Sequence, residues 1–153
     1  MTPNTRRDAL AQIERAMVRI RRSQTRRTIG RLMERELGMR LNMAHSFVVD
    51  ALDETSGIPG KEPSVGMVAE RLGVDSSRAS RMVADAIRGG YVRRVASQVD
   101  GRRMCLELTG AGRKLLKTAS RFRRHFFSRV MASWSDGDCA EFARLLTKFT
   151  EPL

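Results

Sequence analysis

The fold is decided by residues 64–90, which read SVGMVAERLGVDSSRASRMVADAIRGG. Ala69 is small enough for the point where one helix crosses another, and Gly73 follows where a turn favours a residue that tolerates positive φ. After Asp75, a good helix N-cap, the apolar residues recur at helical spacing: Ala79, Met82, Val83, Ala86 and Ile87. The stretch therefore predicts a helix-turn-helix whose second helix buries one stripe and exposes the other.

The predicted outer face of this second helix carries hydroxyl and arginine side chains. They are Ser76, Ser77, Arg78, Ser80, Arg81 and Arg88. A helix that reads the major groove of DNA places small and basic hydrogen-bonding residues in its first turns, and its N-terminal dipole attracts phosphate. These residues are therefore candidates for DNA contact. An ordinary helix pair with a solvated polar face would carry the same residue types.

A β-hairpin is predicted directly after this helix. Residues 91–97 and 104–108 are β-prone, and Asp100-Gly101 between them favours a tight turn. Alternate residues of the return strand are apolar, which gives that strand one buried face. Cys105 falls on the opposite face, where we expect it to be accessible.

A helix-turn-helix followed at once by a two-stranded ribbon is a winged helix. The tip of the predicted wing carries Asp100, Arg102 and Arg103. Arginine on a thin ribbon beside a recognition helix is well placed to enter the adjacent minor groove of DNA. The alternative is an exposed turn whose arginines only aid solubility.

Helices are also predicted on both sides of this unit. One covers residues 5–37, a second follows Asn42, and two more follow Thr109 and Ser135. The predicted fold is mainly α with a small β-wing, in the order α-α-α-α-β-β-α-α. A winged domain of about 65 residues is too small to cover the apolar stripes of the terminal helices, so we expect a second copy of the chain to do so. Packing of these stripes within one monomer is the alternative.

Four segments resemble the MarR (multiple antibiotic resistance regulator) family of winged-helix repressors. Residues 41–52 are similar to its second helix, and residues 64–85 to its helix-turn-helix. Asp100-Gly-Arg102 is similar to its Asp-x-Arg wing motif, and residues 108–116 to its Leu-Thr-x-x-Gly-x-x-Leu motif. The resemblance spans roughly residues 5–150. It departs from the family pattern in an insertion at 58–63 and in the arginine content of the first helix.

The resemblance implies an obligate homodimer that regulates transcription from an inverted-repeat operator as a repressor. Residues 1–40 and 109–153 would then form the dimerisation helices, and residues 41–108 the winged helix-turn-helix that binds double-stranded DNA. Many family members bind phenolic or other aromatic anions, so the resemblance also implies that a small aromatic or anionic effector is compatible with this chain.

Charge supports an anionic partner. The net charge is +12, and 25 of the 29 basic residues are arginine. Basic proteins associate with nucleic acid or with anionic membrane surfaces, and arginine binds phosphates and guanine edges bidentately. Codon use in a GC-rich genome would give the same arginine excess. A non-specific nucleoid or RNA-binding protein, and an interaction module that contacts proteins, are the two other interpretations.

Other classes of function find little support in the sequence. His45, His125, Cys105 and Cys139 lack the spacing of a metal site, and no Ser/His/Asp or Cys/His set indicates catalysis. We therefore expect no enzymatic activity, no metal and no cofactor. The two cysteines make no disulfide framework, and no apolar run is long enough to span a membrane, so a cytoplasmic location without a membrane partner is expected.

Overall fold

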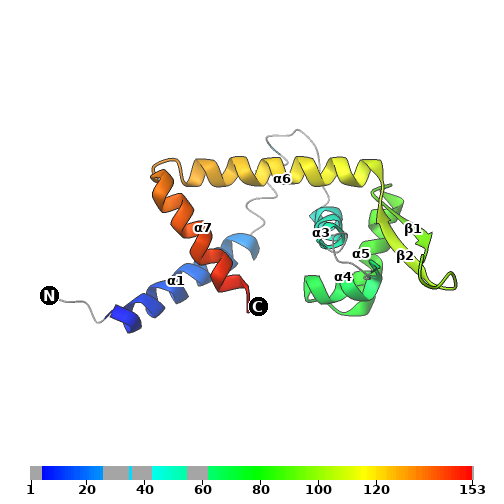
Figure 1. Ribbon diagram of the computed structural model, residues 1–153, viewed down its shortest axis with the longest axis horizontal. Helices are drawn as coiled ribbons and strands as arrows, with labels where there is room; N and C mark the ends of the chain where they lie inside the picture. Colours follow the sequence, from blue (N-terminus) through cyan, green and yellow to red (C-terminus); the bar gives the residue numbers. More distant parts are fainter. Residues whose placement is uncertain (1–4, 26–34, 36–42, 55–61, 153) are drawn as a thin grey trace. The chain divides into compact units, whose positions relative to one another are not determined.

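The computed structural model describes residues 5–25, 35, 43–54 and 62–152 (Figure 1). Two compact units comprise residues 1–119 and 120–153. The predicted order of four helices, two strands and two helices is confirmed in the described residues. The elements are α1 (Thr5–Thr25), α3 (Met43–Asp53), α4 (Val65–Leu72), α5 (Ser76–Arg88), β1 (Val92–Ala96), β2 (Met104–Leu108), α6 (Gly110–Val130) and α7 (Asp136–Thr150).

The hydrophobic core of the first unit lies among α3, α4, α5 and the wing strands. Its most deeply buried large side chains are Val48, Val49, Leu52, Val68 and Val83. Small residues occupy the places where helices approach each other, with Ala79 and Ala86 of α5 fully buried. Because alanine projects only one methyl group, α5 can pack closely on α3 and α4. The expected apolar stripe of α5 is therefore its inner face.

Both helices of the helix-turn-helix begin at a side-chain N-cap, and the turn between them lies at the predicted Gly73. Ser64 Oγ accepts a hydrogen bond from the Met67 amide at 3.3 Å, and Asp75 Oδ1 accepts one from the Arg78 amide at 2.8 Å. Between them, Gly73 adopts the left-handed conformation (φ 59°) that ends α4. A side chain at this position would be strained, so glycine is required for the sharp turn.

The two strands form an antiparallel ribbon in which Val92 pairs with Leu108 and Ala96 with Met104. The connection is wider than the tight Asp-Gly turn that the sequence predicts. It runs from Ser97 to Arg103 and is closed by a turn in which the Arg103 amide donates to the Asp100 carbonyl at 2.8 Å. The described glycines with positive φ are Gly73 and Gly90, so the turn does not use the left-handed glycine of a two-residue hairpin.

The predicted alternation of β2 fails at its first two residues. Met104 is exposed, whereas Cys105 is buried with 7% of its surface accessible. The reason is a second neighbour that the strand pattern does not reveal: the Leu106 amide donates to the Pro63 carbonyl at 2.8 Å. The segment preceding α4 therefore lies against β2 and covers Cys105. The prediction that this thiol is accessible is wrong.

Helix α1 carries a row of half-exposed apolar side chains. They are Leu10, Ile13, Met17 and Ile20, with 43–57% of each residue accessible. The predicted helix over residues 5–37 is present as far as Thr25, and Arg35 is helical. The rest of that prediction, and the predicted cap at Asn42, lie outside the described residues. Among the described helices, none combines the length and apolarity needed to cross a membrane.

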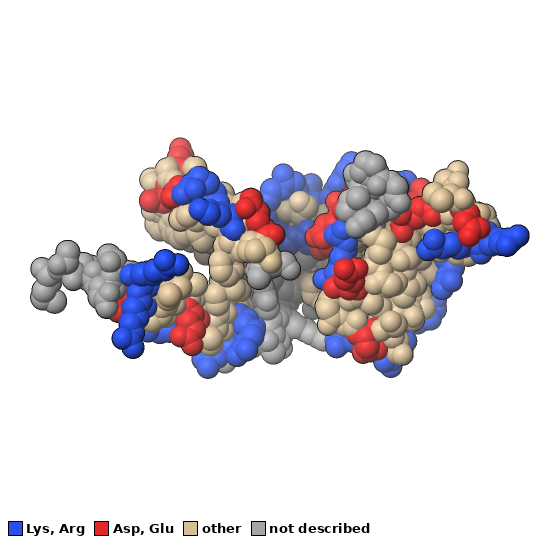
Figure 2. Space-filling view, turned by 60° about the horizontal axis from the view of Figure 1, so that its bottom comes forward, with Lys and Arg blue, Asp and Glu red and all other residues tan. Residues whose placement is uncertain are grey.

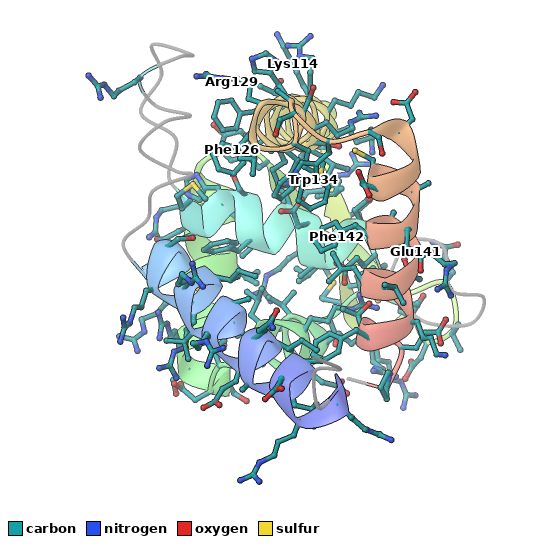
Figure 3. The ribbon with its side chains drawn as sticks, turned by 90° about the vertical axis from the view of Figure 1, so that its left-hand side faces the viewer. Lys114, Phe126, Arg129, Trp134, Glu141 and Phe142 are labelled. Atoms are coloured by element: carbon teal, nitrogen blue, oxygen red, sulfur yellow. The ribbon has the colours of Figure 1, made fainter. Side chains whose placement is uncertain are left out.

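The second unit contains the end of α6 and all of α7. The last helix follows Ser135 as predicted and begins with a capping box: Ser135 Oγ accepts from the Asp138 amide at 3.1 Å, and the Asp138 carboxylate accepts from the Ser135 amide at 3.3 Å. The Trp134 ring meets Phe142 edge to face, with centroids 5.3 Å apart (Figure 3). The apolar residues of α7 remain 44–48% exposed: Phe142, Leu145, Leu146 and Phe149.

The start of α6 is bonded to the residues that join α5 to β1. Thr109 donates from its amide to the Tyr91 carbonyl at 3.0 Å and from Oγ1 to the Gly90 carbonyl at 2.6 Å. Its Oγ1 also accepts from the Gly112 amide at 3.0 Å. A Cβ added to Gly112 would lie 2.1 Å from the Tyr91 carbonyl oxygen. Glycine at this position is therefore imposed by packing against backbone.

We predict that Gly112→Ala destabilises the protein. Alanine normally stabilises a helix relative to glycine by about 0.5–1 kcal/mol, but here the backbone must shift to admit the methyl group, which costs roughly 1–3 kcal/mol. Urea unfolding measures the difference. Gly110→Ala is the matched control, because nothing lies within 4 Å of its Cβ position. Equal stability of the two variants would contradict the packing argument.

Candidate nucleic-acid interface

The first turns of α5 present the predicted contact residues to solvent. Ser76, Ser77, Arg78, Ser80 and Arg81 are all exposed, on the side of the helix away from buried Ala79 and Val83. Arg81 Nε donates to the Ser77 carbonyl oxygen at 3.4 Å, so this bond does not use the two terminal guanidinium nitrogens. Arg78 has no acidic partner in the part of the chain that the structure describes. The first turns of α5 therefore expose two guanidinium groups and three hydroxyl groups.

Arg88, at the far end of α5, differs from the other candidates. It forms an ion pair with Asp85, one helical turn earlier. Both side chains are substantially exposed, so the pair adds little to stability, but it compensates the charge of this arginine. The positive charge of the α5 face is therefore concentrated at its N-terminal end.

The wing carries two exposed arginines on an ordered turn. Arg102 and Arg103 lie at its tip, and Figure 2 shows basic side chains projecting where Figure 1 places the end of the wing. The Asp100 carboxylate accepts from the Arg102 amide at 3.1 Å. Asp100 thus shapes the turn that presents the arginines, which is a different task from the direct contact that its place among the candidates suggests.

Two further arginines, to which the sequence patterns gave no role, lie on β1. Arg93 is directly opposite Glu107 in the ribbon and forms an ion pair with it at 2.8 Å. Arg94 is exposed and lies opposite Leu106. Arg94 shares a ribbon face with the buried residues Val92 and Leu106, so strand alternation alone would not identify it as an exposed basic group on the wing.

Glu62 is a further residue that sequence reasoning missed. Its carboxylate accepts hydrogen bonds from Ser97 Oγ, from the Gln98 amide at 2.7 Å and from Cys105 Sγ at 3.2 Å. The hydrogen bonds from Ser97 and then Cys105 lower the pKa of the Glu62 carboxyl below its ordinary value. Glu62 is therefore ionised at neutral pH. Its partners lie 35 or more residues away, so no local pattern signals this cluster.

Cys105 is a protected thiol. Burial first, and then the Glu62 carboxylate beside it, raise the pKa of Cys105 above its ordinary value. A thiol with a raised pKa carries little thiolate at neutral pH, and the thiolate is the reactive form. Within the described residues, no three His, Cys, Asp or Glu side chains gather as they would around a metal ion.

Comparison with known families matches residues 41–103 to the MarR family. The matched segment contains α3, the helix-turn-helix and the wing as far as Arg103. Curated proteins gave no match.

Solved structures of similar fold extend the likeness to most of the chain. A MarR family protein from Bacillus stearothermophilus is 19% identical, with a TM-score of 0.76 and 97% of each chain covered. The transcriptional regulator BldR from Sulfolobus solfataricus is 21% identical, with a TM-score of 0.67 and coverage of 97% of this chain and 99% of its own. S. aureus MepR bound to ethidium bromide is 17% identical, with a TM-score of 0.58 and coverage of 83% of this chain and 92% of its own. At these identities the likeness is one of fold.

We predict that Cys105 is strongly protected from thiol reagents in the folded protein. In a Cys139→Ser variant, which leaves one thiol, its reaction with an aromatic disulfide at neutral pH should be at least roughly tenfold slower in the native state than in urea, because both burial and a raised pKa oppose attack. Glutathione at the same urea concentrations corrects for the effect of solvent. Equal native and unfolded rates would show that the segment before α4 does not cover this thiol.

Proposed function

We propose that this chain, whose residues 41–103 match the MarR family, is a transcription regulator that binds double-stranded DNA as a homodimer. Two recognition helices related by a two-fold axis read an inverted repeat with half-sites about 10–10.5 bp apart. We further propose repression as the outcome, release by a small aromatic or anionic effector, and action in the cytoplasm.

The observation that carries this proposal is the exposed N-terminal face of α5. The hydroxyl groups and Arg78 and Arg81 occupy the first turns, where a recognition helix meets base edges. The buried stripe of α5 holds this face outward. Arg102 and Arg103 lie on a ribbon that follows the same helix, which suits contact with a neighbouring minor groove or with phosphate. The alternative, a helix pair with a solvated polar face, does not explain why arginines lie both at the start of α5 and at the tip of the wing.

Exposed apolar faces support assembly with a second copy. The apolar rows of α1 and α7 are each about half exposed, and contiguous apolar surface of this kind marks interfaces. A symmetric partner would cover the same rows on both chains. We propose α1, α6 and α7 as the dimerisation helices.

Non-specific nucleic-acid binding is the competing function, favoured by the +12 net charge. It predicts affinity that depends on salt and not on sequence. The sequence-specific proposal predicts a large gap between a selected site and a scrambled duplex at the same salt concentration.

We predict that substitutions in α5 and in the wing affect DNA binding differently. Arg78→Ala or Arg81→Ala should narrow the gap between specific and scrambled DNA, by about 1–3 kcal/mol where the arginine bonds bidentately to a base. Arg102→Ala should weaken binding to both duplexes and reduce the salt slope by about one. The probes are a duplex selected from fragmented genomic DNA of the source organism and its scrambled version, titrated at two salt concentrations.

Arg144→Ala provides the control for loss of positive charge, because Arg144 is paired with Glu141 on α7, outside the winged helix. Unchanged affinities in all three interface variants would show that DNA is not bound by this face. A role as a protein-interaction module would then be favoured.

We predict that an acidic residue in the apolar row of α7 dissociates the dimer. Leu145→Asp places a charge in the proposed interface, where it would be desolvated without a partner. Light scattering after gel filtration should give a mass near 17.2 kDa instead of twice that value. Ala140→Asp adds the same charge on the opposite side of α7 and should remain dimeric. A monomeric wild-type protein would refute the assembly.

A further inference from the structure

Glu62 connects the two strands of the wing through hydrogen bonds. Ser97 directly follows β1, and Cys105 is the second residue of β2, and both donate to the same Glu62 oxygen. The Gln98 amide donates to the other oxygen at 2.7 Å. One carboxylate therefore ties the end of one strand to the start of the other.

Ser97 extends this connection into the wing loop. Its hydroxyl donates to Glu62, which leaves Oγ free to accept from the Val99 amide at 3.1 Å and from the Asp100 amide at 2.9 Å. Ser97 is buried, with 6% of its surface accessible, so water competes little for these bonds. Asp100 in turn accepts from the amide of Arg102. A continuous series of hydrogen bonds thus runs from Glu62 to the backbone of the wing tip.

The backbone that carries Glu62 is itself fixed. The next residue, Pro63, accepts from the Leu106 amide at 2.8 Å, and Ser64 is the N-cap of α4. Glu62 therefore connects the wing to the first helix of the helix-turn-helix. It also lies in the segment at 58–63 where the chain departs from the family pattern, so this connection is a feature of this chain's own residues.

A carboxylate is suited to this place. In its ionised form it only accepts hydrogen bonds, and its two oxygens have lone pairs for several donors. The three donors here are a hydroxyl, an amide and a thiol. A glutamine would have one accepting oxygen, and its NH₂ group would face donors. Substitution by glutamine therefore keeps the size of the side chain but leaves at least one of the three donors without this acceptor.

We infer that Glu62 is a positioning residue that fixes the wing against α4, and so sets where Arg102 and Arg103 meet DNA. This inference rests on the proposed DNA-binding function. Glu62 itself is not expected to contact DNA, since its carboxylate is occupied by the wing.

The sign of the effect on affinity distinguishes positioning from charge. Removal of a negative charge should strengthen binding to a polyanion. Glu107→Gln, a half-exposed wing substitution with the same charge change, which releases Arg93 from its ion pair, should strengthen binding or leave it unchanged. Glu62→Gln should instead weaken binding to the selected duplex roughly three- to tenfold, the range expected for removal of one hydrogen bond. Hydrogen exchange at the Gln98, Val99 and Asp100 amides should accelerate in Glu62→Gln and not in Glu107→Gln.

A double-mutant cycle separates a wing-specific role from a general loss of stability. In an Arg102→Ala, Arg103→Ala background, Glu62→Gln should add no further loss of affinity, because the groups it positions are absent. In an Arg81→Ala background the loss should be fully retained. If Glu62→Gln fails to fold, Ser97→Ala, which breaks the same series of bonds, should show the same pattern.

Equal losses in both backgrounds, or an affinity as high as that of Glu107→Gln, would overturn the inference while leaving the proposed function intact. A wild-type chain that selects no DNA would overturn the proposed function and this inference with it. Unchanged exchange at the three amides would overturn the inference on structural grounds alone.

Discussion

Burial of the small-residue stripe of α5 is the constraint on which the rest of the winged helix depends. Ala79, Val83 and Ala86 must lie against α3 and α4 for the first unit to have a core. Once that face is fixed inward, the helical repeat determines that the serines and arginines of the first turns lie outward. The same placement directs the chain through Gly89 and Gly90 into β1. The candidate interface is thus a geometric result of the core.

Most of the fold was predictable because its signals are local. The caps at Ser64, Asp75 and Ser135 each involve a side chain and an amide three residues away, and the stripes of α5 and α7 follow the helical repeat. The exposed face of α5 was predicted from the same periodicity. These features need no knowledge of distant contacts, so the sequence alone was sufficient for them.

The parts that were missed depend on contacts between distant residues. Cys105 is buried because a segment before α4 lies beside β2, which a strand pattern cannot show. Glu62 was given no role, since the whole helix-turn-helix and β1 lie between it and its partners in the sequence. The Arg88–Asp85 pair was within helical spacing and could have been anticipated, but its effect on the candidate interface is to reduce the charge of one predicted contact. Sequence patterns thus identified the residues at the surface better than the network that orders them.

The bonds of Thr109 and the close approach of Gly112 to Tyr91 have a mechanical consequence. They join the first turn of α6 to the junction between α5 and β1 through two hydrogen bonds and a contact that leaves no space for a methyl group. A rotation of this end of α6 must therefore carry the C-terminus of α5 and the base of the wing with it. Within the first unit, the start of α6 and the candidate interface therefore share one anchoring point, a glycine next to a carbonyl oxygen.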